Sequence, residues 1–172
     1  SKAPMKKATR EDIIANEALK SSFGIMYILF LQFFNLCFTR CVCSKTWKIT
    51  ILKPLYKNKG SKNDPSSYIG ISFLSCIYKI YTRILHSRLS EWAERNAVLP
   101  PEQHGFRKGR STYTAAKEEM ETMKAGVRRC ERQYVCFVDF KKAFDTINRQ
   151  KLLRQLETRG LPKHCGKVIE SI

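Results

Sequence analysis

The sequence predicts an α+β fold, because helical and strand patterns both occur along the 172-residue chain. Residues 75–95 place large apolar side chains on one broad arc at helical spacing, as an amphipathic helix does. Residues 47–56 and 68–73 have the apolar, β-branched and aromatic composition of strands. A turn-rich, cationic segment, residues 57–67, lies between them. These segments indicate a β-hairpin with a basic tip, followed by a long helix.

The remaining elements are mostly helical. Helices are predicted over residues 10–22, 23–42, 113–127 and 148–159, and a largely buried strand over residues 133–139. Gly160 and Pro162 are expected to end the last helix, with Gly160 at the C′ position. Asp145 is interpreted as structural, either capping that helix or pairing with Arg149.

The most apolar stretch of the chain, Phe23–Val42, is long enough to be compared with a membrane span. Polar residues interrupt it at Gln32, Asn35 and Arg40, and its uninterrupted apolar part stops at Leu31. We therefore expect a buried core helix and no stable membrane insertion. Membrane attachment is the alternative, and it would require stable partitioning of the chain into lipid.

The charge points to a polyanionic partner. The chain carries 32 Lys and Arg against 15 Asp and Glu, a formal charge of +17, concentrated in residues 45–110 and 128–167. Self-repulsion on this scale opposes compaction, which favours a partner that supplies negative charge: nucleic acid or an anionic membrane surface. Charge alone does not choose between them. The 43% hydrophobic content argues against disorder.

The cysteines indicate a reducing, intracellular compartment. Seven cysteines form no CxxC pair, and no secretory signal pattern is present. Three of them cluster at Cys37, Cys41 and Cys43 without a neighbouring histidine in the sequence, so we interpret them as buried free thiols rather than metal ligands. Neither basic block forms a compact targeting run, so nucleus and cytoplasm both stay open.

One carboxylate stands in a chemically suggestive position. The apolar run Val135–Val138 ends at Asp139, and a carboxylate at the end of a strand in a basic protein suits a divalent cation. A strand-end Asp is also a common turn or helix cap, which is the alternative. On the first interpretation a basic groove would hold the polyanion while the metal activates its phosphoryl chemistry.

Residues 137–145, FVDFKKAFD, resemble the first catalytic motif of reverse transcriptases from non-LTR (LINE-type) retrotransposons. Further segments are similar to that family in the same order along the chain. They are the fingers hairpin at residues 47–75, the helix that follows it and ends in HSRLSEWAE, the QxGFRxGRST segment at residues 101–112, and the helix with its Gly-Leu step at residues 151–162.

The resemblance implies the fingers and the start of the palm of a right-hand polymerase, in an incomplete form. Its boundaries would be N-terminal helices at residues 1–44, a fingers region with the basic hairpin and helices at 45–132, and the start of the palm at 133–172. The expected partners are an RNA template, a DNA primer and deoxynucleotides.

The resemblance also implies roles for single residues. Asp139 would be the catalytic carboxylate and a ligand of two Mg²⁺ ions, assisted by the backbone carbonyl of Phe140. Phe144 would exclude a 2′-hydroxyl from the nucleotide site and so favour deoxynucleotides. Cationic and polar side chains would contact phosphate. For the incoming nucleotide they are Lys53, Lys57 and Lys59; for the template or primer backbone they are Lys62, Gln103, Arg107 and Arg110.

Three departures from the family pattern qualify this expectation. Ile69 stands where the family usually has an arginine that supports the triphosphate. The APG turn of the family appears as Ala3-Pro4-Met5, and no Asp-Asp pair of the second catalytic motif occurs. We expect a reverse transcriptase domain fragment that is unable to polymerise alone, and poorly soluble or dependent on a partner. The alternative is a non-catalytic, basic nucleic-acid-binding module.

Overall fold

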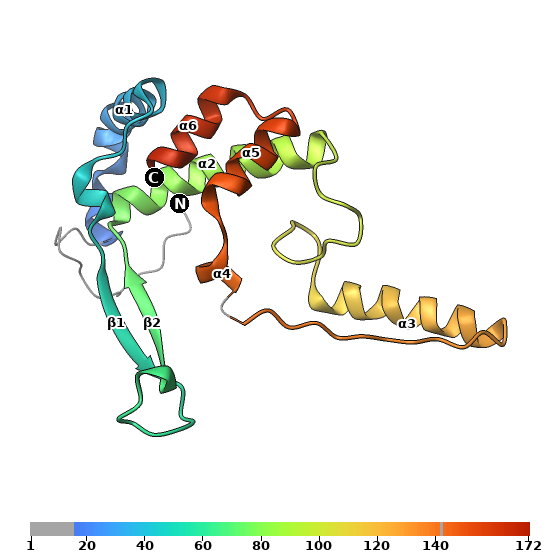
Figure 1. Cartoon of the computed structure of the whole chain (residues 1–172). Helices are drawn as coiled ribbons and strands as arrows, with labels where there is room; N and C mark the ends of the chain where they lie inside the picture. Colours follow the sequence, from blue (N-terminus) through green and yellow to red (C-terminus); the bar gives the residue numbers. More distant parts are fainter. Residues whose placement is uncertain (1–15, 142) are drawn as a thin grey trace. The chain divides into compact units, whose positions relative to one another are not determined.

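The computed structural model describes residues 16–141 and 143–172 (Figure 1). The described residues divide into two compact units, one formed by residues 16–86 and 156–172 and the other by residues between 87 and 155, and each unit is described by itself. The start of the helix predicted over residues 10–22 and the Ala3-Pro4-Met5 turn lie outside the described residues. Both helices and strands are present, in agreement with the predicted α+β class.

The first unit contains a β-hairpin and helices from both ends of the chain. Its elements are α1 (Asn16–Arg40), the 3₁₀ helix η1 (Lys45–Lys48), β1 (Ile51–Tyr56), the 3₁₀ helix η2 (Pro65–Ser67), β2 (Tyr68–Phe73), the first half of α2 (Cys76–Arg95) and α6 (Lys163–Ser171).

Helix α1 is continuous where two helices were predicted, and the prediction of a buried core helix is wrong for most of its surface. Among the α1 side chains that the structure describes, only one stripe is buried, at Phe34 and Cys37, whereas Ile25 is 85% and Leu29 58% exposed. The stripe is narrow because the rest of the first unit packs against one face near the C-terminal end of the helix. In the part of the chain that the structure describes, none of the helices, α1 included, combines the length and the hydropathy that a membrane span requires.

Aromatic side chains form the core of the first unit. The rings of Phe34 and Trp47 both contact the ring of Tyr81, with centroid separations of 5.4 and 5.5 Å. Tyr81 itself is only 2% exposed. Val168 of α6, at 1% exposed, joins the same cluster. Burying a large apolar side chain stabilises a fold by about 1.5–3 kcal/mol, so these few residues hold the unit together.

The predicted strand from Trp47 begins later than expected, at Ile51. Residues Lys45–Lys48 instead form η1, in which the Trp47 amide donates to the Ser44 carbonyl at 3.0 Å. This turn lets the indole of Trp47 enter the aromatic core, where it is 5% exposed. The burial of one large ring thus overrides the alternating pattern that suggested a strand.

The predicted β-hairpin is confirmed. Strands β1 and β2 pair antiparallel, from Ile51 opposite Phe73 to Tyr56 opposite Tyr68. Pro54, which has no amide to donate, lies opposite Gly70 in this two-stranded sheet, where each strand is an edge. Both strands are largely exposed on their two faces.

The second unit is held together mainly by polar contacts. It contains the end of α2, α3 (Thr112–Arg128), α4 (Ala143–Thr146) and the start of α5 (Arg149–Thr158). The helices α2, α3 and α5 confirm the predicted ones. Among its described residues only Val98 and Gly126 are buried, so apolar packing contributes little to this unit.

The strand predicted over residues 133–139 is wrong. These residues are extended but form no ladder, and Phe137 is 91% and Val138 72% exposed. A strand needs a neighbour to satisfy its amides and carbonyls, and the only sheet in the described part of the chain is the β1–β2 pair. The segment is fixed at its start by Gln133, whose Nε2 donates to the Met123 carbonyl at 3.2 Å.

The ends of α5 are capped by local side chains and by glycine. Asn148, and not Asp145 as predicted, accepts from the Lys151 amide at 2.9 Å, while Asp145 lies within α4. Gly160 has a φ of +91°, and the Leu161 amide donates to the Leu156 carbonyl at 3.0 Å. This confirms Gly160 as the C′ residue, since a left-handed backbone favours glycine there.

Candidate nucleic-acid interface

The tip of the hairpin has a defined shape. The Tyr56 hydroxyl donates to the Gly60 carbonyl at 2.6 Å, and the Tyr68 hydroxyl donates to the Lys62 carbonyl at 2.8 Å. The two tyrosine rings lie 5.4 Å apart across the strand ends. Gly60 has a φ of +86°, and a β-carbon there would lie 2.5 Å from the Ser67 hydroxyl, so this position strongly favours glycine. Paired tyrosines therefore fix the backbone on which the lysines stand.

Asp64 orders the return of the tip into β2. Its carboxylate accepts from the Ser66 amide at 2.8 Å and from the Ser66 hydroxyl at 2.6 Å. These hydrogen bonds stabilise the ionised form and lower the pKa of Asp64. The ammonium of Lys57 donates to the Ser66 carbonyl at 2.8 Å, so Lys57 takes part in the same turn.

The lysines predicted to bind nucleotide or template are all exposed in or near the hairpin. Lys53 lies within β1, and Lys59 lies at the tip beside Gly60. The Lys62 ammonium is 6.0 Å from the centroid of the Tyr56 ring. The structure thus brings Lys57, Lys59 and Lys62 onto one short loop, with Lys53 further along the strand.

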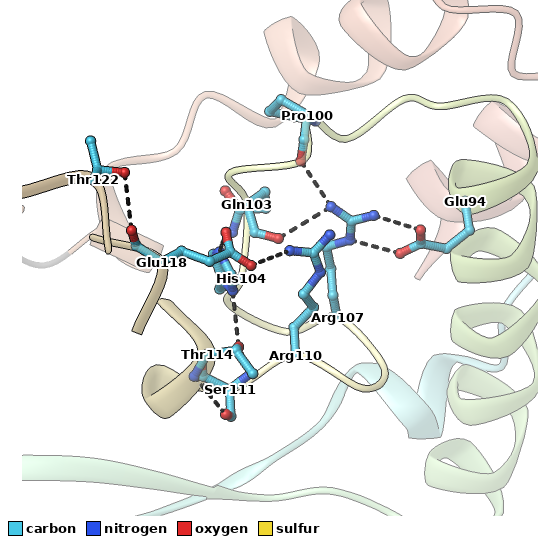
Figure 2. Close-up of polar contacts among 10 residues, drawn as sticks. All are labelled: Glu94, Pro100, Gln103, His104, Arg107, Arg110, Ser111, Thr114, Glu118 and Thr122. Atoms are coloured by element: carbon cyan, nitrogen blue, oxygen red, sulfur yellow. Dashed lines mark hydrogen bonds and ion pairs between the residues drawn. The ribbon is translucent and has the colours of Figure 1, made fainter. Parts of the chain in front are cut away.

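A second polar cluster forms around the glycine-rich loop at residues 103–111. Figure 2 shows Arg107 extended from this loop toward Glu94 near the end of α2. Its Nε and Nη2 donate to the two carboxylate oxygens of Glu94 at 2.8 and 2.7 Å. Its Nη1 donates to the carbonyls of Pro100 at 2.8 Å and Gln103 at 3.3 Å. The side chain is 12% exposed, so its donors serve the loop itself.

His104 and Arg110 tie the same loop to α3. His104 lies 3.0 Å from the Thr114 hydroxyl and 3.1 Å from a carboxylate oxygen of Glu118 (Figure 2). Arg110 reaches the other Glu118 oxygen at 3.5 Å and keeps 29% of its side chain exposed. Ser111 caps α3 by accepting from the Thr114 amide, and the Thr114 hydroxyl accepts from the Ser111 amide.

The three loop residues predicted to contact template differ in how much of each side chain is exposed to solvent. Gln103 is exposed, and its Nε2 donates to the Gly105 carbonyl at 3.2 Å. Arg110 keeps part of its guanidinium exposed, whereas Arg107 is largely covered. The loop therefore presents Gln103 and Arg110 to solvent, and it uses Arg107 as an internal brace.

Asp139, Phe140 and Phe144 lie on one exposed segment. Phe140 is 76% and Phe144 78% exposed, and Asp139 is exposed in the extended stretch before α4. The Phe144 ring meets the Phe106 ring edge to face, with centroids 6.1 Å apart and planes at 82°. Among the described residues, no three His, Cys, Asp or Glu side chains gather closely enough to hold a metal ion.

The clustered cysteines are free thiols of unequal burial. Cys37 is buried as predicted, but Cys41 and Cys43 are only half-buried. Burial raises the pKa of the Cys37 and Cys43 thiols, which keeps them protonated at neutral pH. The fold brings His164 to within 3.4 Å of the Cys41 sulfur, a neighbour that is distant in the sequence.

Several residues that shape these sites escaped the sequence analysis. The pattern Ser111-x-x-Thr114 signals a helix cap and would have found that contact. The hairpin register could have paired Tyr56 with Tyr68. No local pattern points to Glu94, because its partner lies 13 residues away across two prolines.

Comparison with known proteins places these features in a family. Residues 57–172 match the family described as "Reverse transcriptase (RNA-dependent DNA polymerase)". The matched range includes the tip of the hairpin, the 103–111 loop and the Asp139 segment.

Three relatives from Drosophila melanogaster are similar to the chain. They are the probable RNA-directed DNA polymerases from transposon BS (27% identity over 90% of this chain and 17% of the relative) and from transposon X-element (29%; 82% and 16%), and the RNA-directed DNA polymerase from mobile element jockey (26%; 99% and 19%). The chain thus spans less than a fifth of the length of these relatives.

Proposed function

The chain belongs to the reverse transcriptase (RNA-dependent DNA polymerase) family as found in non-LTR retrotransposons, and we propose that it forms the fingers and the beginning of the palm of such an enzyme. On this proposal residues 1–44 are N-terminal helices, residues 45–132 are the fingers, and residues 133–172 begin the palm. Its ligands would be an RNA template, a DNA primer and deoxynucleotides.

The observation that carries the proposal is the rigid, cationic tip of the β-hairpin. Lys57, Lys59 and Lys62 stand on a loop fixed by two tyrosine hydroxyls and by the Asp64 turn. A preorganised loop loses little conformational freedom when phosphates bind, and lysine ammonium groups neutralise phosphate without strict geometry. We assign Lys53, Lys57 and Lys59 to the incoming nucleotide. Lys62 is assigned to the backbone of the template or primer.

The 103–111 loop would hold the second stretch of backbone. Arg110 and Gln103 are its accessible donors. Arg107 stabilises the loop that carries them, because it donates two hydrogen bonds to Glu94 and further hydrogen bonds to two backbone carbonyls. A bidentate pair of this kind is the strongest class of charged hydrogen bond in proteins and fixes geometry as well as distance.

We propose Asp139 as one Mg²⁺ ligand, with the Phe140 carbonyl beside it. Mg²⁺ takes oxygen ligands in octahedral geometry, and polymerase chemistry uses two such ions. The residues in hand do not fit a complete site, since the described part of the chain gathers no group of three ligating side chains. We therefore expect this chain to supply part of the metal site and not to polymerise alone. The Phe144 ring contacts Phe106 and is still 78% exposed, which leaves surface that can pack against a sugar.

A non-catalytic nucleic-acid-binding module is the second candidate. Ile69, which pairs with Leu55 near the tip end of the hairpin and is 51% exposed, offers an alkyl group where the family usually offers a guanidinium. Losing a charge-assisted hydrogen bond of that kind costs about 1.5–3 kcal/mol, which would weaken nucleotide binding. This substitution favours binding without catalysis.

One assay tests nucleic-acid binding and polymerisation together. The chain is mixed with a labelled DNA primer annealed to an RNA template, with Mg²⁺ and deoxynucleotides, and both complex formation and primer extension are followed. We expect a complex, no extension, and an unchanged complex for Asp139→Ala. Adding Arg at position 69 (Ile69→Arg) is expected to raise nucleotide affinity in the complex. Failure to bind the hybrid at low salt would overturn the proposal, and extension by this chain alone would overturn its predicted inactivity.

A further inference from the structure

The most unusual side chain of the second unit is Phe106. Its ring is 91% exposed, and its backbone has a φ of +61°. A bulky aromatic residue in the left-handed region is a steric outlier, and such strain persists only where the surrounding structure imposes it. The phenylalanine at this position is explained neither by burial of its ring nor by a favourable backbone conformation.

The loop around Phe106 is braced on both sides. The next residue, Arg107, holds Glu94 through both carboxylate oxygens. Two residues earlier, His104 contacts Thr114 and Glu118, and its side chain is 11% exposed (Figure 2). These contacts hold Phe106 between two anchored neighbours and present its ring outward.

A second exposed ring completes the arrangement. Phe144, from the segment that follows Asp139, meets Phe106 edge to face at 6.1 Å between centroids. The two rings form an open aromatic corner, because both remain more than three-quarters exposed. Cationic side chains flank it on both segments: Lys108 and Lys141 are exposed, and Arg110 is partly so.

We propose that Phe106 is a stacking residue for an unpaired base of a single-stranded nucleic acid, with Phe144 as its supporting wall. Exposed aromatic rings beside cationic groups are how proteins bind single strands without reading sequence: the rings stack on bases, and the cations meet the phosphates. The proposal rests on the function proposed above and adds the base-contacting residue. It also explains the strain, since a ring must face outward to stack.

The test compares two RNA probes that differ only in whether their central nucleotides carry bases. The first is a short fluorescent oligouridine, and the second is the same strand with abasic residues at its centre. Stacking predicts that the chain binds the first at least about fivefold more tightly, because one stacked base contributes on this scale. The Phe106→Leu variant is expected to lose that ratio and keep its affinity for the abasic strand. Leucine is also disfavoured at a positive φ, so the backbone strain at position 106 is the same in the variant and in the unmodified chain.

Two further variants serve as controls. Phe106→Tyr retains a ring and is expected to retain the ratio. Phe137→Leu removes a ring that is also 91% exposed, from the extended segment, and is expected to change nothing. Equal binding of both strands by the unmodified chain, or an unchanged ratio in Phe106→Leu, would overturn the stacking role alone. Failure to bind either strand at low salt would overturn the proposed function as well.

Discussion

Arg107 and Glu94 form a bidentate ion pair that joins the end of α2 to the glycine-rich loop. The pair is 13 residues apart in the chain, and it is closed by two nearly parallel hydrogen bonds of 2.8 and 2.7 Å. The hydrogen bonds from Arg107 lower the pKa of the Glu94 carboxyl, and Glu94 in turn raises the pKa of Arg107. In a unit with little apolar core, this pair is a principal fixed point.

The Arg107–Glu94 pair is expected to make stability depend on pH. A carboxyl whose pKa is depressed by folding contributes stability above its unfolded value, and that contribution is lost as the pH falls through the folded value. Glu94→Gln should therefore lower the unfolding temperature at about pH 7, and this loss should shrink at about pH 2, where even a carboxyl with a depressed pKa takes up protons. Thermal unfolding of both proteins at the two pH values measures this.

Glu91→Gln is the matched control for that experiment. Glu91 pairs with Arg95 on the same helix, but both side chains are more than half exposed. Exposed pairs of this type contribute about 0–1 kcal/mol, so little change is expected at either pH. If Glu94→Gln shifted the unfolding temperature equally at both pH values, the electrostatic account of the pair would be wrong.

Two glycines are expected to respond to alanine in opposite directions. Gly60→Ala should destabilise the protein by about 1 kcal/mol or more, because the φ there is +86° and the new methyl group would meet the Ser67 hydroxyl. Gly24→Ala lies within α1 with no atom near the new methyl group, and alanine favours a helix over glycine by up to about 1 kcal/mol. Urea unfolding curves of both variants test this, and a stabilising Gly60→Ala would contradict the geometry of the tip.

The narrow stripe of α1 predicts an uneven response to truncation. Phe34→Ala should cost about 3–5 kcal/mol, since Phe34 is 9% exposed and packs on Trp47 and Tyr81. Ile25→Ala, at a position 85% exposed, should change stability by no more than about 0.5 kcal/mol. Equal losses in the two variants, measured by chemical denaturation, would mean that the whole apolar face of α1 is covered in solution.

The hairpin lysines are expected to set the salt dependence of RNA binding. Lys59→Gln should reduce the slope of log affinity against log salt by about 1, as removal of one phosphate contact does. Lys167→Gln removes an exposed lysine from α6, away from the hairpin, and should leave the slope unchanged. Fluorescence anisotropy over a range of salt concentrations measures both slopes. A slope that is insensitive to Lys59 would place the phosphates elsewhere.

The sequence predicted the parts of the fold that local patterns determine. The β-hairpin, α2, α3, α5 and its Gly160 cap were found because periodicity and turn residues specify them within a short window. The errors came from contacts distant in sequence. Trp47 turns into the core to meet Tyr81, and residues 133–139 form no strand without a neighbour to pair with. Neither fact is visible in a local pattern.

In the candidate site, too, some residues could be predicted from the sequence, whereas others depend on contacts between distant segments. The roles of the tip lysines were predicted from resemblance, and Asp139 was predicted from its place at the end of an apolar run as well as from resemblance; these roles remain proposals. The supports of the site, Glu94, His104 and Glu118, carry no local signal, because each acts through a partner from another segment. The aromatic corner of Phe106 and Phe144 likewise depends on a contact between residues 38 positions apart.

Photocrosslinking tests the central claim most directly. An RNA template carrying photoreactive uridines is annealed to a DNA primer, bound to the chain, irradiated, and mapped by mass spectrometry of the crosslinked peptides. The account predicts crosslinks in the hairpin tip at residues 56–68 and in the loop at residues 103–111, and their loss at high salt. Crosslinks confined to α1 or α6, or none at low salt, would contradict it.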